Sequence, residues 1–112
     1  MAGTIRRLAG PVALSVTLTT NVFNDADADL YSVVRHIHVS NKTTSAATFT
    51  LYLGATGANA AGTELFVAHS VAANSEFDWY GMLRMASTDF LVGGAGTATA
   101  LTITVEGEQY VI

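Results

Sequence analysis

The chain has 112 residues, which suffices for one hydrophobic core, and it contains no cysteine, so disulfides and thiolate metal sites are excluded. Its charged fraction is 12%, about half of what soluble domains usually carry, which favours a surface partly covered by neighbouring subunits. The net charge is −4 with only five basic residues, so nucleic acid is not an expected partner. No apolar run approaches the ~18 residues that a membrane helix needs, so a membrane is not expected either.

The N-terminal segment, residues 1–10, is expected to form either an extended arm or the first edge strand of a sheet. It combines apolar side chains with a basic pair, and an extended segment of this kind is able to add a strand to a neighbouring protein. The basic pair would suit an acidic partner surface. The candidate partner-binding residues are Ile5, Arg6, Arg7 and Leu8.

A two-residue alternation of apolar and polar side chains dominates the chain and predicts strands with one buried face. Phe49, Leu51 and Leu53, for example, alternate with Thr50 and Tyr52. Clusters of Gly, Asn, Asp and Ser separate these runs and predict turns. The predicted strands lie near residues 4–8, 12–20, 31–40, 47–53, 64–69, 76–82, 88–92 and 99–109.

This pattern predicts an all-β fold, a single antiparallel β-sandwich of about eight strands over residues 1–112. The jelly-roll and immunoglobulin-like topologies both remain open at this stage. No helix of two or more turns is expected, because no long stripe with a 3.6-residue period occurs. A short helical turn is the alternative for the apolar stretch at residues 82–86.

The predicted strand at residues 31–40 places an arginine among apolar side chains. Under strict alternation, one face of the strand carries Tyr31, Val33, Arg35, Ile37 and Val39. Arg35 would then point inward, unless the strand is bulged or its end is open, and would need Asp78 or Asp89 as a partner. The centre of the core is expected to hold Phe77, Trp79 and Phe90.

Two histidines on the other face of this strand are the candidate metal ligands. His36 and His38 are two residues apart and therefore project from the same face, and His69 would supply a third imidazole. The sandwich metalloproteins called cupins carry such a His-x-His followed by a Glu, but residues 39–43 here contain no Glu. The simpler interpretation is a pair of polar residues on a solvated or interface face.

Residues 24–29 (NDADAD) resemble the start of a calcium-binding loop, in which alternate oxygens face one ion. An EF-hand needs Gly at its sixth position and Glu at its twelfth, and counting from Asp25 these positions hold Leu30 and His36. The EF-hand interpretation is therefore excluded. A looser surface calcium site and a solvated turn are the two interpretations that remain.

No catalytic constellation is found in the sequence. There is no cysteine nucleophile, the serines lack a G-x-S-x-G elbow, and the Gly-rich residues 93–96 lack the Lys of a phosphate-binding loop. The chain is therefore expected not to be an enzyme and to need no cofactor.

Five strand-and-turn segments together resemble small β-sandwich proteins encoded among the structural genes of tailed bacteriophages. These segments are residues 31–41 (YSVVRHIHVSN), 49–54 (FTLYLG), 76–81 (EFDWYG), 87–92 (STDFLV) and 101–107 (LTITVEG). The resemblance implies a virion component, in some cases a decoration or cement protein on the capsid exterior and in others part of a tail. It implies no catalytic residues.

The leading hypothesis is a capsid decoration or cement protein that binds the major capsid protein and stabilises the capsid exterior. It would be made in the host cytoplasm, reside on the virion surface and act as a homo-oligomer, with a trimer favoured. The first alternative is a tail or tail-tip module that binds a host carbohydrate or receptor through Tyr52, Trp79 or Tyr80. The second alternative is a small metal-binding jelly-roll enzyme.

Overall fold

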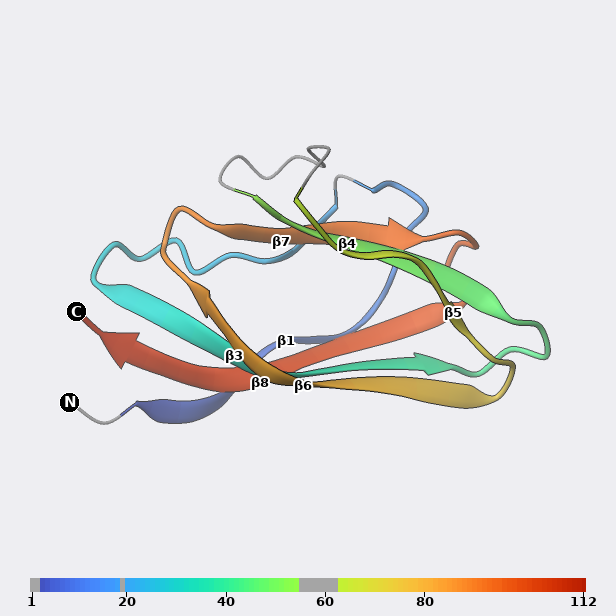
Figure 1. The fold of residues 1–112 in the computed structure, drawn as a ribbon, viewed down its shortest axis with the longest axis horizontal. Coiled ribbons are helices and arrows are strands. Elements are labelled where there is room, and N and C mark those ends of the chain that lie inside the picture. Colours follow the sequence, from blue (N-terminus) through green and yellow to red (C-terminus); the bar gives the residue numbers. More distant parts are fainter. Residues whose placement is uncertain (1–2, 19, 55–62) are drawn as a thin grey trace.

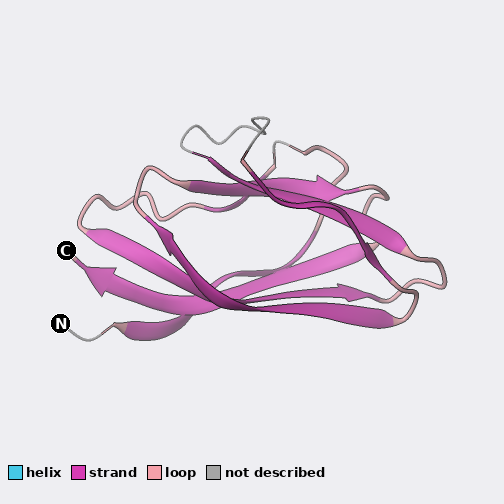
Figure 2. Cartoon of the chain, in the orientation of Figure 1, coloured by secondary structure: helices cyan, strands magenta, loops and turns pink. Residues whose placement is uncertain are grey.

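The fold is built from antiparallel strands arranged in two layers (Figure 1). It is seen in a computed structural model that describes residues 3–18, 20–54 and 63–112. These residues contain no helix, and therefore none that is long and apolar enough to cross a membrane (Figure 2). The strands are β1 (Thr4–Ala13), β2 (Asn21–Phe23), β3 (Leu30–Asn41), β4 (Ala47–Gly54), β5 (Glu64–Val71), β6 (Ser75–Met85), β7 (Phe90–Ala95) and β8 (Leu101–Val111).

The order of the strands identifies the topology as a jelly roll. One sheet has the order β1-β8-β3-β6 and the other β2-β7-β4-β5. Strand β1 pairs with β8, β2 with β7, β3 with β6 and β4 with β5, always antiparallel. This nested pairing is that of one long antiparallel ribbon rolled up on itself, so the immunoglobulin-like alternative is excluded.

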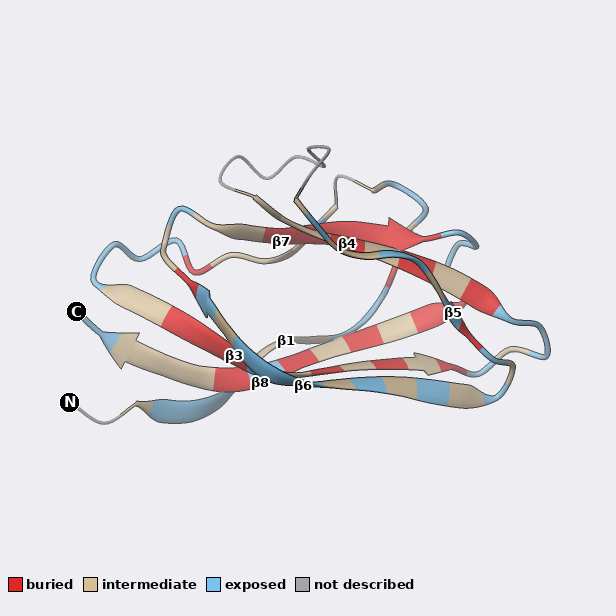
Figure 3. Ribbon diagram, in the orientation of Figure 1, coloured by how far each residue is buried: buried red, intermediate tan, exposed pale blue. Residues whose placement is uncertain are grey.

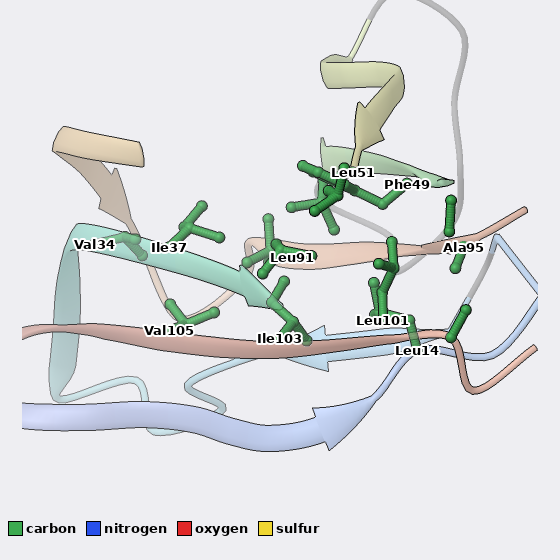
Figure 4. Packing of buried hydrophobic residues seen from close by; sticks show 14 of the residues in the cluster. Leu14, Val34, Ile37, Phe49, Leu51, Leu91, Ala95, Leu101, Ile103 and Val105 are labelled. Atoms are coloured by element: carbon green, nitrogen blue, oxygen red, sulfur yellow. The ribbon is translucent and has the colours of Figure 1, made fainter. Parts of the chain in front are cut away.

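The hydrophobic core fills the space between the two sheets (Figure 4). On β8, Leu101, Ile103 and Val105 are buried while the intervening threonines are half-buried, as the two-residue alternation predicts (Figure 3). The centre of the core is expected to hold Phe77, Trp79 and Phe90, but the largest fully buried side chain is Phe49 of β4. Those residues are less buried: Phe77 and Trp79 pack against the edge of the core, and Phe90 is half-buried.

Strand β3 contains a bulge, and because of it the expected inward position of Arg35 is wrong. The register of β3 shifts against both neighbouring strands between Val34 and His36. Because one extra residue is inserted there, the alternation of faces is broken, and the Arg35 side chain is 49% exposed instead of inward. Its guanidinium pairs with Glu108 of β8 at 2.9 Å, so neither Asp78 nor Asp89 is its partner. The bulge thus keeps the charge out of the core, where it would be costly.

Two further predictions about the strands are wrong. The strand expected at residues 12–20 is wrong: residues 12–13 complete β1, and residues 14–18 and 20 form no strand where the chain crosses to the other sheet. On the way, the carbonyl of Ser15 accepts a hydrogen bond from the N–H of Ala95 at 2.8 Å, which closes part of the β7 edge. Residue 19 lies outside the described residues. The helical turn considered for residues 82–86 does not form either, since β6 continues to Met85, whose side chain is buried.

Candidate functional site

The ionisable side chains with the densest mutual contacts lie on the outer face of the β1-β8-β3-β6 sheet. Strand β6 shows how the sequence places them there, because its residues alternate between half-buried and exposed from Ser75 to Tyr80. The inward positions Phe77, Trp79 and Leu83 pack against the core, whereas Asp78 and Tyr80 point outward. The adjacent rings Trp79 and Tyr80 therefore lie on opposite faces, as the sequence predicts, and Tyr80 is 71% exposed.

His36 and His38 meet Asp78 across the pairing of β3 with β6. In the register of these strands, His38 lies opposite Asp78 and His36 lies opposite Tyr80. One carboxylate oxygen, Oδ1 of Asp78, lies 2.6 Å from Nδ1 of His38 and 2.7 Å from Nε2 of His36. The aspartate thus joins the two imidazoles, which makes a compact His-Asp-His cluster on a solvent-facing surface.

The His36 ring is held from two further sides. Its other nitrogen, Nδ1, lies 3.3 Å from Oε1 of Glu106 on β8. The Tyr80 ring stacks on the imidazole with 4.5 Å between centroids and 1° between planes. These contacts fix the orientation of the ring and aim Nε2 at Asp78.

The charges of the cluster stabilise one another. Hydrogen bonds from His38 and then His36 lower the pKa of Asp78 below its ordinary value of 3.8. For His36, partial burial lowers the pKa, but the hydrogen bonds to Asp78 and Glu106 outweigh it and leave the pKa raised above 6.5. The cluster therefore favours an ionised aspartate next to a protonated histidine.

The same three residues are suitable metal ligands. Their ligand atoms all lie within 4.8 Å of one another, and among the described residues no other group of three His, Asp or Glu is as close. His69 is not part of the cluster, because it lies on β5 with its ring 4.2 Å from that of Phe77. Asp78 was missed as a ligand by sequence reasoning, since it lies 40 residues from His38 in the chain and only the strand register brings them together.

A groove of about 550 Å³ runs beside this cluster over β1, β8 and the bulge of β3. Three of the four residues predicted to bind a partner line it, namely Ile5, Arg6 and Arg7. The fourth, Leu8, packs against the hydrophobic core. The rest of the lining consists of Arg35, His36, Glu106, Gly107 and Glu108, so the groove carries charges of both signs.

Two carboxylates of residues 24–29 accept hydrogen bonds from the protein itself. Asp25 is buried and accepts hydrogen bonds from the Ser32 hydroxyl at 3.1 Å and from Nε2 of Gln109 at 2.5 Å. Asp27 accepts a hydrogen bond from the backbone N–H of Asp29 at 2.9 Å, which closes a turn. The carboxylates of Asp25 and Asp27 are thus directed at the protein itself, in line with the turn interpretation.

Comparison with known proteins gives a structural likeness but no sequence family. No family model matches the chain, and no curated protein matches its sequence. Among solved structures, the coat protein of tobacco streak virus is similar, with a TM-score of 0.41 and 10% sequence identity. The alignment covers 99% of this chain and 87% of the coat protein.

Proposed function

We propose that this protein is a non-enzymatic structural component of a virus particle, which binds the major capsid protein on the capsid exterior as a homotrimer. The observation that carries the proposal is the edge strand β1 with its exposed apolar and basic side chains. This strand pairs with β8 on one side, and none of the other described strands pairs with it. Ile5 on this strand is 86% exposed, and Arg6 and Arg7, which follow it, are exposed as well.

An edge strand of this kind is a template for strand addition by a partner. Main-chain hydrogen bonds to a neighbouring strand would supply affinity, and the side chains of residues 4–7 would supply specificity. The two arginines suit an acidic strip on the capsid subunit. Further apolar groups lie at the same end of the sandwich, where the start of β1 pairs with the end of β8: Val111 is 52% and Ile112 is 77% exposed.

The scarcity of charge on the surface also supports assembly. Only 12% of the residues are charged, and interface cores are depleted in charged residues. Repeated copies on a symmetric shell would gain avidity from many weak contacts, so each single contact need not be strong.

Co-sedimentation with capsids of the virus that encodes the chain tests the proposal. Replacing Ile5 with Asp should weaken capsid binding at least about tenfold, because it places a charge in the docking strand. The matched control is Val67→Asp on β5 of the other sheet, where the side chain is 67% exposed, and it should bind like the wild type. Equal binding by both variants, or capsids that lack the chain, would overturn the proposal.

A tail module that binds a host carbohydrate is the second candidate, and the exposed ring of Tyr80 favours it. Aromatic rings pack against sugar faces, and this ring is 71% exposed at the rim of the histidine cluster. One face of the ring is already covered by His36, so a single face is left for a sugar. Glycan-array binding that disappears in Tyr80→Ala would favour this function over the capsid role.

A further inference from the structure

We propose that His36, His38 and Asp78 form a binding site for a divalent cation of the zinc class on the outer face of the β1-β8-β3-β6 sheet. The inference does not depend on the capsid role, since it rests on the cluster of ligand atoms alone. It assigns Nε2 of His36, Nδ1 of His38 and Oδ1 of Asp78 as the ligand atoms.

The donor set is one that zinc prefers. Two imidazole nitrogens and a carboxylate oxygen bind Zn²⁺ with bonds of about 2.0–2.2 Å, and tetrahedral geometry then separates ligand atoms by roughly 3.3–3.5 Å. In the structure Asp78 Oδ1 lies 2.6 and 2.7 Å from the two nitrogens, and all three atoms lie within 4.8 Å. Ion entry therefore requires these contacts to open by less than about 1 Å.

Metal binding needs only a rearrangement of the imidazole protons, with any excess proton passing to solvent. In the metal-free state, imidazole N–H groups donate to the shared oxygen of Asp78. For metal binding, His36 keeps its proton on Nδ1 and His38 keeps its proton on Nε2, so that each presents a lone pair to the ion. Any imidazole that is protonated before binding releases one proton to solvent.

Glu106 supplies the outer support that histidine ligands of metals usually have. Its carboxylate lies 3.3 Å from Nδ1 of His36, the nitrogen that does not face the proposed ion. A metal-bound histidine almost always donates its second N–H to such a group, which fixes its tautomer and increases its basicity. The stacked ring of Tyr80 holds the same imidazole in plane.

The backbone under the site is hydrogen-bonded on both sides. Strand β3 is hydrogen-bonded to β8 on one side and to β6 on the other, so both histidines lie on a strand with neighbours on each side. The ligand side chains remain accessible to an ion from solvent, because they are 22%, 37% and 32% exposed for His36, His38 and Asp78. Three protein ligands leave a fourth position, which water would fill.

Titration of the chelator-treated 112-residue chain with Zn²⁺ by calorimetry tests the site, with Co²⁺ as a spectroscopic probe. We expect one ion per chain and the visible absorption of four-coordinate cobalt with nitrogen and oxygen ligands. His38→Ala and Asp78→Asn should each weaken Zn²⁺ binding by more than about 100-fold, and Glu106→Gln by about 10- to 100-fold.

Asp29→Asn is the matched control, because it removes one exposed carboxylate outside the cluster and should leave the affinity unchanged. The absence of Zn²⁺ binding by the wild type would overturn the proposal, as would equal affinities of the wild type and Asp78→Asn. Should a variant fail to fold, ring-nitrogen NMR of the wild type decides. Zn²⁺ must shift Nε2 of His36 and Nδ1 of His38, and a response confined to His69 would contradict the assignment.

Discussion

At the scale of residues, the structure differs from simple alternation at the bulge of β3. The sequence predicts that His36 and His38 share one face, and both do contact Asp78. It also predicts an inward Arg35, which is wrong because the extra residue at the bulge turns that side chain outward. A bulge leaves no fixed mark in the sequence, so neither the position of Arg35 nor its pairing with Glu108 could be predicted.

The pH dependence of stability tests the electrostatics of the His-Asp-His cluster. The raised pKa of His36 contributes stability that is present below its unfolded value of 6.5 and lost as the pH rises through the folded pKa. The lowered pKa of Asp78 contributes stability that is present above its unfolded value of 3.8 and lost as the pH falls through the folded pKa. The cluster therefore stabilises the fold most between these two ordinary values.

Urea unfolding of the wild type and Asp78→Asn, with chelator present at each pH, measures this contribution. The loss of unfolding free energy in the variant should be largest between about pH 4 and 6.5 and should shrink as the pH rises through the folded pKa of His36. The size of the loss is limited by solvent screening, because Asp78 is about one third exposed. A loss that is constant with pH would contradict the ionic origin.

At the scale of elements, the predicted strands were confirmed where alternation is uninterrupted and wrong where the chain changes sheet. Strands β3 and β4 begin and end within one residue of the predicted ranges. The segment after Ala13 also alternates, yet it leaves its sheet and follows the edge of β7. Alternation reports which side of a segment is apolar, and it does not report the neighbour to which the backbone is hydrogen-bonded.

The close approach of this segment to β7 depends on a glycine. A Cβ on Gly94 would lie 2.5 Å from the carbonyl oxygen of Ser15 and 3.0 Å from that of Thr17. Gly94→Ala should therefore destabilise the fold by about 1–3 kcal/mol, because backbone must shift to admit the methyl group.

Gly96→Ala is the matched control for this prediction. A Cβ there would meet the side-chain oxygen Oγ1 of Thr48 at 2.8 Å, and a side chain is able to rotate away. Urea unfolding of both variants gives the comparison. A loss for Gly94→Ala no greater than that for Gly96→Ala would show that the crossing segment does not pack as described.

At the scale of the whole molecule, the fold class could be predicted from the sequence but the topology could not. About eight predicted strands and the absence of a 3.6-residue apolar stripe suffice to predict a two-layer β-sandwich, which the structure confirms. The jelly roll is defined by pairs that are far apart in sequence, such as Thr4 of β1 opposite Gln109 of β8. No local pattern specifies such partners, and for the same reason Asp78 could not be assigned to the histidine cluster in advance.

The proposed role assigns the chain to a virus particle, and an electron-microscopy reconstruction of that particle tests the role most directly. The account predicts jelly-roll density in groups of three on the outside of the capsid, with β1 against the capsid subunit. A reconstruction in which this density is missing from the shell, or lies in the tail, would contradict it.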